Sequence, residues 1–119
     1  MQEIMNLPTR EQSGVVVASV SGRIDHTSSE AFEKSLQPLV AACSAGCPAL
    51  LLDFSAVEYI SSAGLRVLMA VSRQAKGQKG VFAIAALQPM VQEVFAISRF
   101  NLIVPCYASV DSACKVIGQ

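Results

Sequence analysis

Two adjacent serines, Ser61 and Ser62, stand where a side chain could do chemistry. They follow an apolar run at residues 50–53, which predicts a strand buried on both faces of a sheet. A helix predicted over residues 63–76 comes directly after them. Open α/β sheets present their working groups beyond the carboxyl ends of strands, and the positive end of a helix dipole favours an anion there. Ser62 could also be a helix N-cap, a structural role that serine often takes.

Basic and apolar residues follow Ser62 along the same predicted helix. Arg66 comes one turn later and Arg73 two turns after that, so these side chains share a face with Ser62. Arg66 could pair with a phosphate or with an acidic residue of a partner, or it could simply be solvated. Met69 and Ala70 border this face and would supply an apolar contact patch.

Catalysis by these residues is not expected. Asp25, His26 and Ser62 could be written as a triad, but Asp25 and His26 are sequence neighbours and are poorly placed to form a relay. A Gly-x-Ser-x-Gly elbow, a dinucleotide-binding glycine loop and a Walker A motif are absent from the sequence. Asp25 is more simply explained by turn formation or helix capping, and Asp53 by holding the turn after its strand. We expect no enzyme activity, no cofactor and no metal.

The sequence around the two serines resembles the STAS domain family, and within it the anti-sigma factor antagonists. The resemblance is carried by Leu-Asp-Phe-Ser at residues 52–55 and by Tyr-Ile-Ser-Ser-Ala-Gly-Leu-Arg at residues 59–66. It implies that Ser62 is the phosphorylated serine, with Ser61 as the second candidate because many members carry Asp there. It also places Asp25 at the family's acidic position, in a loop expected to lie beside Ser62.

The resemblance implies a regulatory binding module. When Ser62 is unphosphorylated, the protein would sequester an anti-sigma factor that is also a serine kinase, and would thereby release a sigma factor. The kinase would phosphorylate Ser62 with ATP, and a PP2C-type phosphatase would reverse the modification. The implied partner-binding residues are Asp25, Ser61, Ser62, Arg66, Met69 and Arg73.

Other functions within the same family stay open at this point. A STAS domain can also be a subunit of a membrane lipid-transport ATPase complex, or a domain related to anion transporters. Direct binding of a nucleotide is a third hypothesis. The output of the switch, the identity of its kinase and the oligomeric state are not specified by the sequence.

The strands that must position these residues begin with a predicted hairpin. A first strand at residues 3–7, a polar segment at 8–14 and a β-branched run at 15–20 predict it. Further strands are predicted at 50–53, 81–85 and 103–104, the last at an edge because Pro105 cannot donate to a ladder. Strands then alternate with helices, which predicts a mostly parallel sheet with helices packed on it. Together with the resemblance, this implies a STAS-type α/β fold, with a mixed, mostly parallel sheet of about five strands and about four helices.

Predicted helices lie between the predicted strands. Thr27 and Glu30 fit a capping box that starts the first helix near Ser28, and Pro38 is expected to kink that helix. The central helix is predicted to stop at a left-handed Gly77. Its core-facing stripe is predicted at Leu65, Leu68, Met69, Ser72 and Ala75.

Two more helices are predicted in the last third of the chain. Pro89 suits the first turn of one of them, and Asn101 could cap its end. The residues expected to pack this helix are Met90, Val94, Phe95 and Ile97. Ser109 is predicted to cap the last helix, whose apolar side is formed by Val110, Ala113, Cys114 and Ile117.

Composition favours one cytoplasmic domain spanning residues 1–119. The formal net charge is zero, so nothing in the overall charge attracts the chain to nucleic acid or to an anionic membrane. The beginning of the chain lacks the features of a signal peptide, and no apolar run approaches the length of a membrane span. The cysteines are expected to be reduced thiols, and their spacing is a weak zinc pattern because C-x-x-C pairs are absent; they are Cys43, Cys47, Cys106 and Cys114.

Overall fold

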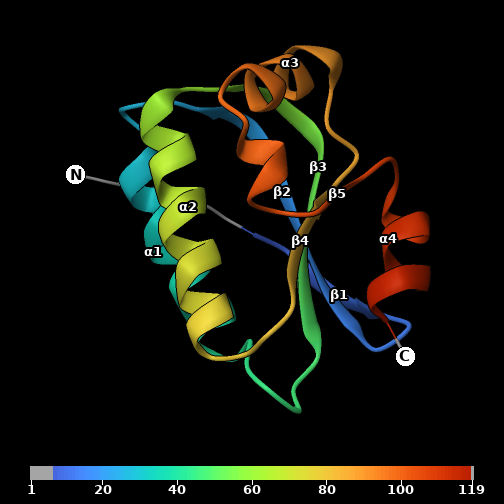
Figure 1. Cartoon of the computed structure of the whole chain (residues 1–119). Coiled ribbons are helices and arrows are strands. Elements are labelled where there is room, and N and C mark those ends of the chain that lie inside the picture. The colour runs from blue at the N-terminus through green and yellow to red at the C-terminus, as the bar shows by residue number, and fades with distance from the viewer. Residues whose placement is uncertain (1–6, 119) are drawn as a thin grey trace.

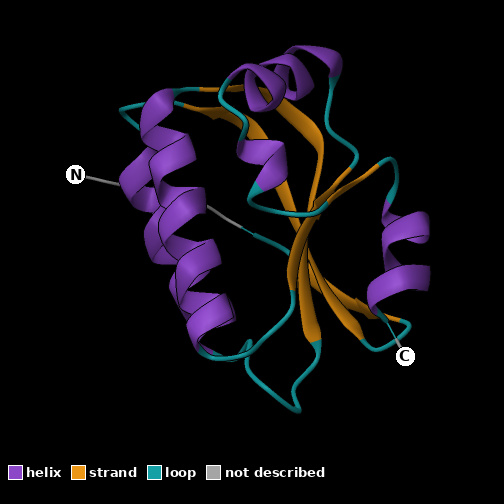
Figure 2. Ribbon diagram, viewed as in Figure 1, coloured by secondary structure: helices purple, strands orange, loops and turns teal. Residues whose placement is uncertain are grey.

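The computed structural model describes residues 7–118 as a single sheet with helices on both faces (Figure 1). Figure 2 shows the strands of this sheet crossing the middle of the molecule between the two layers of helices. The elements are β1 (Thr9–Gln12), β2 (Val15–Ile24), α1 (Ser29–Ala41), β3 (Ala49–Ile60), α2 (Ser62–Gly77), β4 (Phe82–Ala85), α3 (Pro89–Ile97), the 3₁₀ helix η1 (Phe100–Leu102), β5 (Cys106–Tyr107) and α4 (Val110–Ile117).

The strands lie in the sheet in the order of the chain, from β1 to β5. β1 is antiparallel to β2, and every later pair of neighbours is parallel. The carboxyl ends of β2 and β3 therefore meet at one edge, which is where the loops leading to α1 and α2 begin. The predicted fold class is confirmed: a five-stranded, mostly parallel sheet with an N-terminal hairpin and four α-helices.

Alternation along the strands builds a different core on each face of the sheet. Leu50, Leu52 and Phe54 of β3 point toward the core that α1, α2 and α3 cover. Ala49 and Leu51 point to the opposite face, where α4 packs. Figure 1 shows this division, with α1 and α2 against one face and α4 against the other. Burial on both faces explains why the strand reads as an unbroken apolar run.

The hairpin forms later in the chain than the sequence predicted. Its first strand is β1, inside the segment that we expected to be a turn, and it pairs Thr9 with Ala18 and Gln12 with Val15. The turn residues Ser13 and Gly14 both have positive φ angles, 55° and 76°, as a two-residue type I′ hairpin requires. Most of the strand expected at residues 3–7 lies outside the described residues; Leu7 is described and is not in a strand.

Both central strands run further than predicted, and their extension carries the site. We expected β2 to end before Gly22 and β3 to end at Asp53, but they continue to Ile24 and Ile60. Shifts of register near Ser21 and Gly22 accommodate the irregularity, and Gly22 adopts a φ of 86°. Bulges of this kind bend strands without ending the pairing. The Ser21–Gly22 segment, which we expected to end the strand, therefore lies within β2.

Helix limits were predicted less well than helix positions. The predicted start of the first helix near Ser28 is confirmed, since α1 begins at Ser29. The Thr27–Glu30 capping box is wrong, because Ser28 is the N-cap and makes no side-chain cap hydrogen bond. Pro38 lies inside a continuous α1. Gly77 is the last residue of α2 and does not take a left-handed conformation; Lys79, with a φ of 62°, does. The buried face of α2 also differs from the predicted stripe, since its members are Gly64, Val67, Leu68, Val71, Ser72 and Ala75.

The last third of the chain keeps the predicted order with shifted details. In α3, Val91 and Phe95 are buried, whereas Met90 and Ile97 are exposed. Asn101 lies within η1 and does not cap α3. The short edge strand follows Pro105 instead of preceding it, as β5 shows. Ser109 caps α4 as predicted, and the expected apolar side of that helix packs on the sheet.

Gly64 allows α2 to begin in close contact with the ends of β2 and β3. A Cβ at this position would lie 2.7 Å from Ile60 Cγ1, 2.8 Å from Ile24 Cγ2 and 3.2 Å from the Ile24 carbonyl oxygen. No side chain larger than hydrogen fits without moving these neighbours. The close packing of α2 against Ile24 and Ile60 therefore explains why a glycine is needed at position 64.

We predict that Gly64→Ala lowers the free energy of unfolding by about 1–2 kcal/mol, because the clash exceeds the helix propensity that alanine adds. Gly77→Ala is the matched control on the same helix, since its added Cβ meets no atom within 4 Å; it should raise stability by up to about 1 kcal/mol. Urea denaturation of both variants measures this. Equal effects of the two substitutions would contradict the close contact.

Candidate functional site

The two serines at the start of α2 have different surroundings. Ser61 is the N-cap of α2, is half-buried, and its hydroxyl accepts a hydrogen bond from the Gly64 amide at 3.4 Å. Ser62 is the first residue of the helix and is exposed. The N-cap role that we considered for Ser62 therefore belongs to Ser61. The Ser62 hydroxyl has no hydrogen-bond partner among residues 7–118, so it is free to react.

A backbone hydrogen bond joins this serine pair to the loop after β2. The Ser61 amide donates to the carbonyl oxygen of Ile24 at 2.8 Å. Asp25, the next residue, thus lies beside the start of α2, as the sequence predicted for these two loops. The start of α2 is held by backbone groups, which leaves the Ser62 side chain without a structural task.

Asp25 organises the turn that leads into α1. Its Oδ1 accepts hydrogen bonds from the Thr27 hydroxyl at 2.7 Å, the Thr27 amide at 3.0 Å and the Ser28 amide at 3.2 Å. The Ser28 hydroxyl accepts from the Asp25 amide and donates to the Arg23 carbonyl oxygen. The hydrogen bonds from Thr27, followed by those from Ser28, lower the pKa of the Asp25 carboxyl below its ordinary 3.8. Asp25 therefore has the turn-forming role that we considered for it.

The outer face of α2 is basic and carries no acid. Arg66 and Arg73 are exposed, and neither forms an ion pair with a carboxylate of residues 7–118. Met69 differs from them, because it is partly buried and packs against the core. The first turn of α2 contains no acidic residue, unlike the first turns of α1 and α4. The positive end of the helix dipole is thus not neutralised from within the helix.

Sequence reasoning missed an aromatic–cation pair beside the serines. Arg23 and Tyr59 are register partners at the ends of β2 and β3, and the Arg23 guanidinium carbon lies 4.5 Å from the centre of the Tyr59 ring. Such a pair is attracted through the ring's quadrupole. The signal was weak in the sequence, because both residues lie beyond the points where we expected the strands to end.

Other chemistries find little support among the described residues. The Asp25 carboxylate makes its hydrogen bonds to Thr27 and Ser28 and not to His26. Among residues 7–118, no group of three or more His, Cys, Asp or Glu side chains is placed to hold a metal ion. The cysteines are free thiols, with Cys43 and Cys114 buried and Cys47 exposed. No helix in the same range is both long and apolar enough to cross a membrane.

Comparison with known proteins identifies relatives along almost the whole chain. The STAS domain family matches residues 6–113. BtrV of Bordetella bronchiseptica, named as a candidate anti-sigma factor antagonist, is 34% identical over 92% of this chain and 91% of its own. RsfB of Mycobacterium tuberculosis, an anti-sigma-F factor antagonist, is 37% identical over 64% of this chain and 59% of its own. The crystal structure of an anti-sigma factor antagonist from Mycobacterium paratuberculosis superposes with a TM-score of 0.82 at 30% identity, covering 94% of this chain and 92% of the other.

The two serines should separate in a stability measurement. We predict that Ser61→Ala lowers the free energy of unfolding by about 0.5–1 kcal/mol, through loss of the N-cap. Ser62→Ala should change it by less than about 0.5 kcal/mol, because an exposed side chain without partners is removed. Chemical denaturation of the two variants side by side tests this. A larger loss from Ser62→Ala would show that Ser62, not Ser61, stabilises the helix start.

The Asp25 turn should make stability depend on acid pH. A carboxyl whose pKa is lowered on folding stabilises the folded state above its unfolded pKa, and this contribution is lost as the pH falls through the folded pKa. We expect the wild type to lose stability as the pH falls below 3.8, and Asp25→Asn to lack that part of the loss. Urea midpoints measured across this range provide the test. Glu93→Gln, at an exposed acid, is the matched control, and an identical pH profile for Asp25→Asn and wild type would contradict the assignment.

Proposed function

The chain belongs to the STAS domain family, and from that premise we propose that it is an anti-sigma factor antagonist switched by phosphorylation of Ser62. The unphosphorylated protein binds an anti-sigma factor and so releases the sigma factor that the anti-sigma factor held. The observation that carries the proposal is the exposed Ser62 hydroxyl at the first position of α2, which has no hydrogen-bond partner in the described part of the chain. The names of BtrV, RsfB and the mycobacterial crystal structure support it.

The start of α2 can carry a phosphate without disturbing the fold. Phosphorylation adds nearly two negative charges and strong hydrogen-bond acceptors. At Ser62 these would face the amides of the first helical turn, where a negative charge is stabilising and where no acidic side chain is present. Because the Ser61 hydroxyl is already engaged with the Gly64 amide, modifying Ser61 would cost the helix its cap. This difference favours Ser62 as the acceptor.

A partner docked on the same surface would be affected much more than the fold. A small neutral hydroxyl that fits an interface becomes a bulky anion, which must be desolvated or excluded when the partner binds. The result is a switch that acts at the interface. The domain itself keeps one structure, and only its affinity for the partner changes.

The charge of α2 indicates what kind of partner surface it meets. Arg66 and Arg73 are exposed on the same helix as Ser62, one turn and three turns after it, and have no carboxylate partner among residues 7–118. Facing acidic residues of an anti-sigma factor would pair with them and steer association. Asp25 and the half-buried Ser61 complete the surface at the sheet edge, and Met69 gives it an apolar border.

The modifying enzymes follow from the same scheme. We assign phosphorylation to a serine kinase activity of the anti-sigma factor, and dephosphorylation to a PP2C-type phosphatase. The protein itself acts by binding and not by catalysis. Because the switch consumes ATP, we place it in the cytoplasm. A role in a lipid-transport complex or an anion transporter is not favoured, since the named relatives are anti-sigma factor antagonists.

The decisive variants are Ser62→Ala, Ser62→Asp and Ser61→Ala. Incubated with the cognate anti-sigma kinase and ATP, wild type and Ser61→Ala should gain one phosphate at Ser62, mapped by mass spectrometry, and Ser62→Ala should gain none. In calorimetric titrations with the same kinase, Ser62→Ala should bind like wild type. Ser62→Asp should bind at least about tenfold more weakly, because it leaves a charge unpaired at the interface.

Two results would overturn the proposal. One is phosphate found only at residues other than Ser62 in the wild type. The other is a Ser62→Asp protein that binds the kinase as tightly as Ser62→Ala does. Recovery of a membrane ATPase in place of a kinase, when the tagged protein is used as bait, would favour the lipid-transport role.

A further inference from the structure

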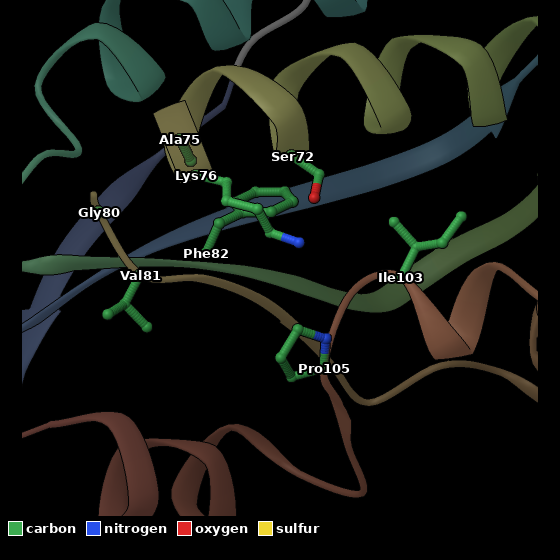
Figure 3. A pocket seen from close by; sticks show the side chains of 8 residues that line it. All are labelled: Ser72, Ala75, Lys76, Gly80, Val81, Phe82, Ile103 and Pro105. Carbon is green, nitrogen blue, oxygen red and sulfur yellow. The ribbon is translucent and has the colours of Figure 1, made fainter. Parts of the chain in front are cut away.

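The second half of α2 borders a cavity far from Ser62. The cavity has a volume of about 230 Å³ and lies between α2, the start of β4 and the segment before β5 (Figure 3). Its apolar walls are formed by Ala75, Val81, Phe82, Ile103 and Pro105. Ser72, which also lines the cavity, lies ten residues after Ser62, or about 15 Å along the helix axis. The cavity is thus separate from the phosphorylation site at Ser62.

Ser72 places a hydroxyl at this cavity. The residue is only 7% exposed, and it is the only buried polar residue among those described. Its hydroxyl has no hydrogen-bond partner among residues 7–118. Figure 3 shows the Ser72 oxygen pointing away from α2, on the side where Phe82 and Lys76 lie. No buried side-chain oxygen or nitrogen among the described residues lacks a partner, so the Ser72 oxygen is open to solvent through the cavity, and a ligand atom could take the place of water there.

Lys76 brings a positive charge to the same opening. It lies one turn after Ser72 and lines the cavity, and Figure 3 shows its side chain leaving α2 on the same side as that of Ser72. The only ion pair among residues 7–118 is between Lys34 and Glu30, so Lys76 has no acidic partner there. A hydroxyl and an ammonium group that line the same cavity could together bind a carboxylate.

The remaining walls require an apolar ligand body. Phe82 is buried at the base, while Val81 and Ile103 are 48% and 41% exposed around the opening, where a hydrocarbon would cover them. The volume exceeds that of the ~150 Å³ cavity that accommodates benzene and falls below the roughly 300 Å³ at which drug-sized pockets begin. The occupant is therefore small, with one anionic end and a short hydrocarbon tail.

We propose that this cavity is a binding site for a short-chain aliphatic carboxylate, with its head on Ser72 and Lys76 and its tail against Phe82 and Ile103. The protein would thus hold a small metabolite-sized ligand on the helix that also carries the phosphorylation site. This proposal does not depend on the partner-switching role, because neither Ser62 nor a partner protein takes part in the cavity. Its test uses the protein alone.

The probes are sodium acetate, butanoate and hexanoate, titrated into the isotopically labelled protein and followed by NMR. Hexanoate should bind saturably in the millimolar range and shift the amides of Ser72, Phe82 and Ile103. From acetate to hexanoate the affinity should rise by roughly fourfold per added carbon. Hexanol should bind more weakly than hexanoate, because it lacks the charge.

Variants locate the head and the tail of the ligand. Lys76→Gln should weaken hexanoate binding about fivefold, as expected for an exposed ion pair, and Ser72→Ala should also weaken it. Arg73→Gln, which removes a neighbouring charge of α2 outside the cavity, should leave the affinity within about twofold. Ile103→Trp should abolish binding by filling the opening without touching a buried position.

Absence of saturable shifts with hexanoate in the wild type would overturn the proposal. Equal effects of Lys76→Gln and Arg73→Gln would overturn the assignment of the carboxylate head. The dispersion of each variant's spectrum reports folding, and Lys76→Gln and Ser72→Ala decide the question if Ile103→Trp does not fold. Failure of Ser62 to be phosphorylated would leave these titrations unchanged, so the two proposals can fail separately.

Discussion

The carbonyl oxygen of Ile24 is the point on which the arrangement of the site depends. It accepts the Ser61 amide at 2.8 Å, and a Cβ on Gly64 would lie 3.2 Å from it. This contact exists only because β2 and β3 run in register to Ile24 and Ile60, which brings the end of one strand beside the helix that follows the other. Once α2 is fixed by backbone groups, its first exposed side chain is free for regulation.

A division of labour between two neighbouring serines follows from this geometry. Ser61 turns inward and satisfies a helix amide, while Ser62 stays exposed. A charge added to Ser62 would meet a helix end with no acid of its own and a face whose arginines have no acidic partner within residues 7–118. Under the proposed function, the fold would tolerate that charge, whereas a docked protein would lose contacts. Stability and binding are thereby separated, as a switch with one folded structure requires.

Much of this could be predicted from the sequence, because the governing signals were local. The apolar run of β3, the helix after Ser62 and the small residues of the motif specified the fold class and the exposed hydroxyl. The limits of elements could not be predicted in the same way. Gly22 and Asp53 look like strand breaks, yet the pairing of β2 with β3 continues past both through bulges. The Arg23–Tyr59 pair and the contact of Ser61 with Ile24 depend on that longer pairing, so they could not be predicted from any single segment of the sequence.

The most direct test of the central claim is amide hydrogen exchange on the protein with Ser62 unphosphorylated and fully phosphorylated. The account predicts that the Ser61 amide, bonded to Ile24, keeps its protection, that the amides of the first turn of α2 become more protected, and that the sheet does not change. Loss of protection at Ser61 or throughout β3 would contradict it, because phosphorylation would then act by unfolding the site and not by altering its surface.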